Sequence, residues 1–352
     1  MMKKSKSYRL ATVIVSMVGL LNLPALAAEP VLVNVDNSEP PEVTIHNYVR
    51  AETDVQMQTY SENFDCFGKF SHVRGAYDVT STDTIRPNLD TLYSWGVFDV
   101  SSPLTVELPD SGDRYQSLMV LTQDHSIWAE YGPKTVVFDQ DTVGTRYVML
   151  LVRTFLDPND TADVKEAQAL QDAIKVKQDD KGEYNVPGWD QKEVEKMRNA
   201  INVFAPFATD SSKTFGLKND LDPVYWLLGA AVGWGGLPAK DSTYTGGFPD
   251  KNDGKTAYTM TIRDVPVDAF WSVTVYNDKG MFAINDHNSY SYNSVTAKRD
   301  EDGSVTLRFG GDPDQPNYLH IVPGWNYVVR MYLPRKEILD GTWKFPEPVE
   351  VK

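Results

Sequence analysis

The stretch RPNLDTLYSWGVFDV, residues 86–100, begins as a polar turn and continues as a strand. Pro87 fixes its own φ and biases Arg86 toward extended backbone. The turn also carries residue types that bond their own backbone, namely Asn88, Asp90 and Thr91. Apolar and polar residues then alternate, which is the period of a half-buried strand. The stretch therefore predicts a strand that starts at an unusually polar corner.

Runs of the same kind follow, separated by turn-forming segments. They are LTVELP (104–109), YQSLMVLTQ (115–123), SIWAEYG (126–132), KTVVFD (134–139) and RYVMLLVRTFL (146–156). A second set of runs lies near the C-terminus: TAYTMTIRD (256–264), FWSVTVYND (270–278), SVTLRFGG (304–311), YLHIVP (318–323) and NYVVRMYLP (326–334). Short strands separated by turns at regular intervals are typical of a β-sandwich or a β-barrel.

Helices are expected between these two sets of strands and ahead of the first. Apolar residues recur at helical spacing within residues 161–177 and 190–204. A third helix begins after Asp222, an N-cap followed by a proline, and a further helix is expected within residues 43–64.

These patterns predict a mainly β protein with a helical insert (α+β), in which helices join two antiparallel β-sandwich, jelly-roll-like domains. The expected divisions are a signal peptide at 1–27, a lead-in segment at 28–43, an N-terminal β domain with a leading helix at 44–160, a helical insert at 161–240 and a C-terminal β-sandwich domain at 241–352.

The first 27 residues combine a basic start, a short apolar run and a small-residue cleavage signal, which is typical of secretory signal peptides. We therefore expect a periplasmic or secreted protein with no membrane insertion after cleavage. Removal of these residues takes away four basic residues, so the net charge changes from −15 to −19 (30 − 49). This acidity argues against nucleic acid as a partner.

Cysteine and cofactor signals are sparse. Cys66 is the one cysteine, so an intramolecular disulfide is excluded, and its aromatic surroundings predict a buried thiol. No phosphate-binding glycine motif, nucleophile elbow or spaced metal-ligand motif occurs. Cofactors stay unknown, and a divalent metal has no support from residue spacing.

Several long segments resemble a known pair of domains. They are PNLDTLYSWGVFDV (87–100), RYQSLMVLTQD (114–124), FWSVTVYNDKGMF (270–282), DGSVTLRFGG (302–311) and YVVRMYLPRKEILDGTWKFPEPVE (327–350). Together they resemble the domains of unknown function (DUF) 1254, N-terminal, and 1214, C-terminal, of the exported bacterial type, over about residues 45–345. Leu89 stands where relatives often carry Asn. The resemblance implies two β-sandwich domains joined through helices and carries over no catalytic residue.

The polar corner is the first candidate site. Asp90 could act as a general acid or base, with Tyr93 and Asn88 as positioning groups. The other residues assigned to ligand binding there are Arg86, Thr91 and Arg153, the two arginines as anchors for an anionic substituent. The alternative is a structural corner in which Asp90 caps backbone N–H groups.

The second candidate site is the polar loop 279–298, in which His287 is a candidate catalytic group and Tyr290 a ligand-binding group. A solvated surface loop is the alternative. Asp124 and His125 form a weaker pair, because neighbours on a strand point to opposite faces. Six tryptophans either line a pocket between the domains or belong to the cores: Trp95, Trp128, Trp226, Trp234, Trp271 and Trp325. For Trp271 the alternation of apolar and polar residues around it favours the core.

Two hypotheses of function follow. The first is an exported protein that binds or transforms a small polar molecule in a cleft between the domains. The second is a non-catalytic periplasmic binding or assembly protein, with aromatic contacts that form a homo-oligomer. The sequence leaves open which is right and whether the protein is an enzyme.

Overall fold

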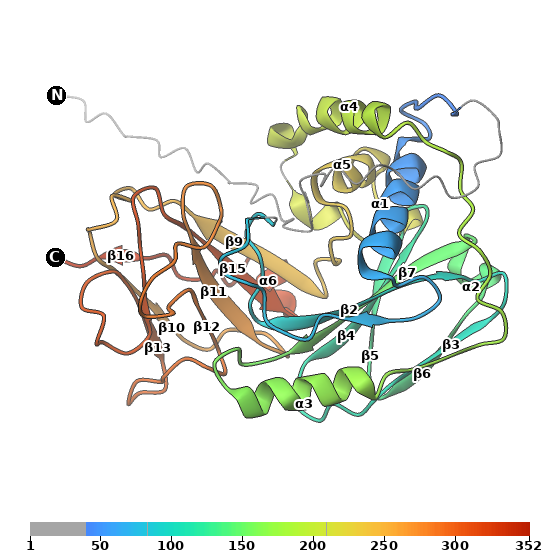
Figure 1. The fold of residues 1–352 in the computed structure, drawn as a ribbon. Coiled ribbons are helices and arrows are strands. Elements are labelled where there is room, and N and C mark those ends of the chain that lie inside the picture. Colours follow the sequence, from blue (N-terminus) through green and yellow to red (C-terminus); the bar gives the residue numbers. More distant parts are fainter. Residues whose placement is uncertain (1–39, 83, 209) are drawn as a thin grey trace, which may run out of the picture.

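The computed structural model describes residues 40–82, 84–208 and 210–352. The expected signal peptide and most of the lead-in segment lie outside the described residues. The described part is a mixed α+β protein with more strand than helix, and its antiparallel sheets lie in two regions. Figure 1 shows the strands of the N-terminal region on the right and those of the C-terminal region on the left.

The N-terminal region is built from two sheets. A five-stranded antiparallel sheet has the order β1-β2-β7-β4-β5, and a three-stranded sheet has the order β6-β3-β8. Their bounds are β1 Ser71–His72, β2 Thr91–Asp99, β3 Leu104–Leu108, β4 Gln116–Thr122, β5 Ile127–Tyr131, β6 Lys134–Phe138, β7 Tyr147–Phe155 and β8 Lys175–Gln178. One buried apolar cluster takes residues from both sheets, among them Phe98, Leu104 and Leu150.

The C-terminal region also has two sheets, of four strands each, in the orders β14-β13-β10-β16 and β12-β11-β15-β9. Their bounds are β9 Ser242–Gly247, β10 Tyr258–Ile262, β11 Trp271–Tyr276, β12 Ser291–Asn293, β13 Val305–Phe309, β14 Tyr318–Leu319, β15 Asn326–Tyr332 and β16 Val349–Glu350. A cluster around Trp325 contains side chains of both sheets. Trp271 belongs to this core, which confirms the expectation from its strand pattern.

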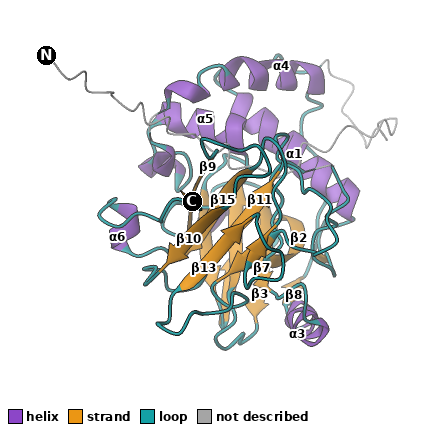
Figure 2. Ribbon diagram, turned by 90° about the vertical axis from the view of Figure 1, so that its left-hand side faces the viewer, coloured by secondary structure: helices purple, strands orange, loops and turns teal. Residues whose placement is uncertain are grey.

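The helices cover the strands at one end and along one side. They are α1 Tyr48–Phe64, α2 Gln140–Val143, α3 Thr161–Asp172, α4 Gln191–Asn202, α5 Pro223–Gly233 and α6 Lys336–Leu339. In both views α4 and α5 lie together beyond one end of the strands (Figure 2). None of the described helices is long and apolar enough to cross a bilayer.

Most expected elements are confirmed, and one is corrected. The expected helix over residues 161–177 ends at Asp172, and Lys175–Gln178 forms β8 instead. The apolar spacing fitted either structure, but pairing of β8 with β3 decides the outcome because it satisfies the backbone of an otherwise unpaired edge. The buried thiol is also confirmed: Cys66 is fully buried, and burial raises its pKa to about 12.

Strand β15 explains how the two regions meet. Val329 and Met331 face the core of the C-terminal region, whereas Val328 and Tyr332 face the opposite way. Tyr332 stacks on Phe270 with ring centroids 4.3 Å apart, and the same cluster includes Phe155 of the N-terminal region. Burial of both faces of β15 therefore places the boundary between the regions inside the molecule.

A buried ion pair joins α1 to α4. The Arg198 guanidinium donates to both carboxylate oxygens of Glu52 at 2.8–3.1 Å, and the Glu52 side chain is only 1% exposed. Tyr48 Oη donates to the same carboxylate at 3.2 Å.

Replacement of Arg198 by Met should therefore lower the free energy of unfolding by about 3–5 kcal/mol, because the Glu52 carboxylate stays buried without its counter-ion. Lys196→Met, which removes an exposed pair on the same helix, should change it by less than about 1 kcal/mol. Urea denaturation measures both. Equal losses in the two variants would contradict this role for the pair.

Candidate functional site

The polar corner is held against the C-terminal region by its own backbone. Arg86 N donates to the Gly280 carbonyl at 2.7 Å, and Arg330 donates to the Arg86 carbonyl at 2.8 Å. Tyr276 Oη donates to the Pro87 carbonyl at 2.6 Å. The expectation of an extended Arg86 is wrong: its φ is +54°, in the left-handed region. These three hydrogen bonds fix that conformation against the steric bias of the following proline.

Asn88 organises the hydroxyl groups beyond the turn. The backbone N–H of Asp90 donates to Asn88 Oδ1 at 3.0 Å, so the amide nitrogen must point the other way. Asn88 Nδ2 faces Thr91 Oγ1 at 3.1 Å, Tyr93 Oη at 3.3 Å and Tyr332 Oη at 3.1 Å. Asn88 thus joins both regions through a single amide.

Asp90 is buried, 2% exposed, and incompletely hydrogen-bonded. Its Oδ1 accepts from Asn293 Nδ2 at 3.1 Å, whereas its Oδ2 is buried and has no hydrogen-bond partner among the described residues. Burial raises the pKa of Asp90, and the smaller opposing effects of Ser272, Asn293 and Arg330 do not cancel it. The Ser272 hydroxyl lies near the carboxyl group, but its oxygen is likewise buried without a hydrogen-bond partner among the described residues. The Asp90 carboxyl group therefore does not accept hydrogen bonds from backbone N–H groups of the turn, as the structural alternative expects. The side chain of Asn88 accepts such a bond instead, from the N–H of Asp90.

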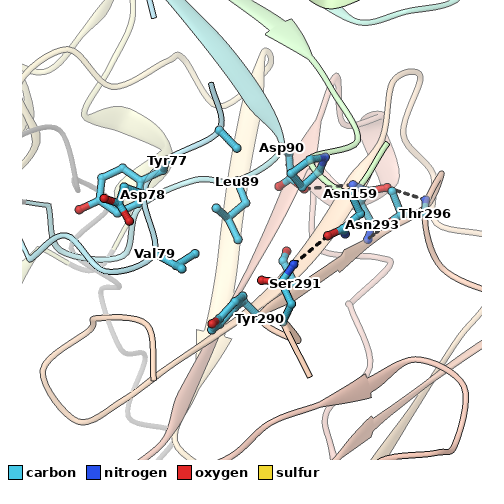
Figure 3. A pocket seen from close by; sticks show the side chains of 13 residues that line it. Tyr77, Asp78, Val79, Leu89, Asp90, Asn159, Tyr290, Ser291, Asn293 and Thr296 are labelled. Atoms are coloured by element: carbon cyan, nitrogen blue, oxygen red, sulfur yellow. Dashed lines mark hydrogen bonds between the residues drawn. The ribbon is translucent and has the colours of Figure 1, made fainter. Parts of the chain in front are cut away.

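A cavity of about 270 Å³ adjoins this carboxyl group. It lies between segments of both regions, as Figure 3 shows for Asp90 and Asn293. The lining residues are Ala76, Tyr77, Asp78, Val79, Leu89, Asp90, Pro158, Asn159, Asn288, Tyr290, Ser291, Asn293 and Thr296. Most of them carry polar side chains, so the cavity suits a small polar molecule better than an apolar one.

Two buried arginines occupy the centres of the facing sheets. Arg153 on β7 lies between Tyr93 on β2 and Ser117 on β4 in the strand register. Arg330 on β15 lies between Ser272 on β11 and Tyr244 on β9. Tyr244 interacts electrostatically with both arginines, which places its phenol group between the two sheets. The boundary between the regions is therefore polar as well as aromatic.

Two family models match the chain: residues 67–178 match "Protein of unknown function (DUF1254)" and residues 242–336 match "Protein of unknown function (DUF1214)". The chain carries both domains. The DUF1254 match spans eight of the strands described above, from β1 to β8, and the DUF1214 match begins at β9. No curated protein matches this chain.

Two solved structures are similar to it. The crystal structure of the VPA0106 protein from Vibrio parahaemolyticus has 21% sequence identity and a TM-score of 0.67, and the match covers 87% of this chain and 98% of that one. An uncharacterized protein from Burkholderia cenocepacia has 15% identity and a TM-score of 0.48, with coverage of 90% and 92%. The first likeness shows that the fold is shared over 87% of this chain.

The structure brings together most of the residues predicted for the site, at the boundary of the DUF1254 and DUF1214 domains. Asn88, Asp90, Thr91 and Tyr93 lie at the polar corner, and Tyr290 lines the cavity. His287 lies apart from them: it is exposed, does not line the cavity, and its ring packs against Tyr318 with centroids 5.4 Å apart.

The weaker pair in the DUF1254 domain does not form a site. His125 Nε2 accepts from Gly235 N at 3.0 Å, and burial lowers the pKa of His125 to about 3. Asp124 instead forms ion pairs with Arg50 and Lys218. None of the six tryptophans lines the cavity described above. Within the described residues there is no cluster of three acidic, His or Cys side chains arranged to hold a metal ion.

Apart from Tyr290, the DUF1214 residues of the candidate site were not predicted from the sequence. They are Tyr244, Ser272, Asn293, Arg330 and Tyr332. Arg330 carried a usable signal, since it is a charged residue inside the otherwise apolar run of β15. Arg153 carries the same signal on β7.

The raised pKa of Asp90 predicts how its substitution changes stability with pH. The folded chain holds this proton more tightly than the unfolded chain does. The stability that the protonated group contributes is complete below the ordinary pKa of about 3.9 and is lost as pH rises through the raised pKa. The amide side chain of the Asp90→Asn variant does not titrate, so the variant does not lose this stability. The free energy of unfolding of Asp90→Asn minus that of the wild type should therefore increase as pH rises from about 4.

Urea denaturation across pH measures this difference. Asp113→Asn, an exposed position in the same domain, should follow the wild type at every pH. An Asp90→Asn advantage that shrinks as pH rises would show that the carboxylate is stabilised in the folded chain.

Proposed function

We propose that the DUF1254 and DUF1214 domains together bind a small polar molecule in the cavity between them, and that Asp90 exchanges a proton with it. The observation that supports this most is the Oδ2 atom of Asp90, which is buried without a partner beside that cavity. A buried polar atom left unpaired costs about 1–3 kcal/mol, so its retention calls for an explanation. A hydroxyl or amide group of a bound molecule would supply the missing partner.

The electrostatics support a role in proton transfer. A carboxyl group whose pKa is raised by burial can give up or take a proton nearer neutral pH than an ordinary aspartate can. Asn293 holds one oxygen of Asp90, which leaves the other free to meet a ligand. Asn88 acts as a positioning residue, because it fixes the backbone of Asp90 through its Oδ1 atom.

The proposal extends to location and architecture. We infer that the chain acts in the periplasm or outside the cell after removal of residues 1–27, on the evidence of their basic and apolar pattern. We also infer that each region is a β-sandwich, since two sheets in each share one apolar cluster.

A second candidate is a non-catalytic binding or assembly protein that forms homo-oligomers. Exposed apolar side chains near the ends of α4 and α5 favour it: Val203 66%, Phe204 63%, Phe207 78% and Val224 63% exposed. Light scattering of the wild type and of Phe204→Ser with Phe207→Ser decides whether this face joins copies of the chain. Equal masses for the two proteins would contradict that role for the face.

A thermal-shift screen tests the first candidate. The purified protein is screened against sugars, phosphoesters, organic acids and divalent metals. A ligand at about 100 times its dissociation constant adds about 2.7 kcal/mol to the stability of the folded state. We expect at least one polar ligand to raise the melting temperature, and Asp90→Asn to abolish that rise. Asp113→Asn should keep it, because the Asp113 side chain is exposed and does not line the cavity.

An Asp90→Asn variant that keeps every ligand effect of the wild type would show that Asp90 does not contact the bound molecule.

A further inference from the structure

Arg153 is a buried cation for which the described residues supply no anionic partner. The residue is 6% exposed, and within the part of the chain that the structure describes its side chain makes one hydrogen bond, from Nη1 to the thioether sulfur of Met119 at 3.7 Å. Its guanidinium carbon lies 5.8 Å from the centre of the Tyr93 ring. None of the ion pairs of the described residues includes it, although buried charges are ordinarily paired.

Tyrosine hydroxyl groups add further donors around this guanidinium. Tyr93 Oη and Tyr332 Oη each accept from Asn88, whose orientation is set by the backbone N–H of Asp90. Their own hydroxyl protons must therefore point elsewhere, and no acceptor for them occurs among the described residues. Tyr60 Oη is buried without a partner and interacts electrostatically with both Tyr93 and Arg153.

The rings that carry these hydroxyl groups are held in place. Tyr93 stacks on Trp95 with centroids 5.5 Å apart and planes 10° apart. Tyr60 packs on the same indole at 4.6 Å, and Tyr332 stacks on Phe270. The hydroxyl groups are therefore preorganised, which lowers the entropy cost of binding an acceptor between them.

We propose that the Arg153 cluster, made of Arg153, Tyr60, Tyr93 and Tyr332, binds the carboxylate group of a small organic acid. The cluster offers one positive charge and three hydroxyl protons but lacks an acceptor for them. A carboxylate group can accept hydrogen bonds from these donors and balance the positive charge. It carries one negative charge, accepts at two oxygens and matches the planar guanidinium in geometry.

The hydrogen bonding of the two buried arginines places the carboxylate at Arg153. Arg330 already donates to Thr274 Oγ1, Tyr276 Oη and the carbonyls of the 86–87 turn. Arg153 has no oxygen acceptor among the described residues, so its guanidinium can pair with one carboxylate. The chain as a whole is acidic, with a net charge of −15, so attraction of the ligand must come from this local group.

The inference rests on the proposed function, because it names the chemical class of the molecule held between the domains. Tyr332 links the two places: its phenol contacts Asn88 and interacts electrostatically with Asp90, which lines the cavity. The acid group would thus bind the Arg153 cluster on the side of the boundary opposite to the proton-exchanging carboxyl group.

Matched pairs of acids and amides provide the test. Calorimetric titration of the purified full-length chain uses acetate and acetamide, propionate and propionamide, succinate and succinamide, and benzoate and benzamide, with inorganic phosphate and sulfate as further probes. We expect at least one acid to bind about tenfold or more tightly than its amide. Arg153→Met should weaken that acid about 100-fold and remove the preference. Lys175→Met, at an exposed ion pair of the same domain, should leave both unchanged.

One further variant and a measurement of melting temperature show whether a loss of binding comes from misfolding. Tyr332→Phe keeps the stacked ring and removes one donor, so it should weaken the acid about fivefold. Arg153→Met should melt no lower than the wild type in buffer without carboxylates, because it removes an unpaired buried charge and adds an apolar side chain beside Met119. A structural arginine would give the opposite shift.

The outcomes separate this inference from the proposed function. Equal binding of acid and amide, kept in Arg153→Met and lost in Asp90→Asn, would overturn the carboxylate site and leave the cavity proposal intact. Binding of phosphate or sulfate alone would overturn the carboxylate assignment. No binding by any of these probes would overturn the carboxylate site, and the thermal-shift screen with sugars and phosphoesters would then decide the cavity proposal.

Discussion

The structure depends on the hydrogen bonds that Arg330 makes to the turn ahead of β2. Its guanidinium donates to the carbonyls of Arg86 and Pro87, at 2.8 and 3.3 Å, and to Tyr276 Oη at 2.9 Å. These bonds dock a turn of the DUF1254 domain on the central strands of the DUF1214 domain. The turn in turn fixes Asn88, and Asn88 fixes the positions of Asp90 and of the tyrosine hydroxyl groups. Hydrogen bonds to a charged donor are stronger than those between neutral groups, so one side chain can hold this boundary in register.

The boundary is more polar than the stability of the fold requires. Each sheet already buries one apolar face within its own region, around Trp325 in one and Leu150 in the other. The faces turned toward each other carry two arginines, Asp90 and several tyrosines, at positions where apolar residues would pack without unpaired atoms. Buried polar groups without partners oppose folding, and they are commonly retained where a ligand completes them. We interpret the boundary as a site for this reason.

Much of the fold could be predicted from the sequence, since strand alternation and helix caps are local signals. The turn at residues 86–90 shows the limit of such signals. Proline chemistry predicted an extended Arg86, but hydrogen bonds to Gly280 and Arg330, about 200 residues away in the chain, produce a positive φ. Residues 175–178 were misassigned for the same reason, because pairing with β3 outweighs the local helical spacing.

The N-terminal half of the candidate site was predictable, whereas of its DUF1214 residues only Tyr290 was. Asn88, Asp90 and Tyr93 are close in sequence, so their polarity at the start of one strand was visible as a cluster. Their partners Asn293, Arg330 and Tyr332 come from separate strands of the other domain, and only the folded chain brings them together. His287 illustrates the reverse error, since a histidine in a polar loop is a conspicuous candidate yet lies exposed and outside the cavity lining.

The central claim is that the protein itself leaves the Asp90 carboxyl group incompletely satisfied. Carbon-13 NMR titration of labelled aspartate carboxyl groups, with the Asp90 signal assigned from Asp90→Asn, measures this most directly. Our account predicts a pKa for Asp90 above the ordinary value of about 3.9. A pKa at or below that value would mean that the chain fully stabilises the carboxylate, and the boundary would then be a structural corner.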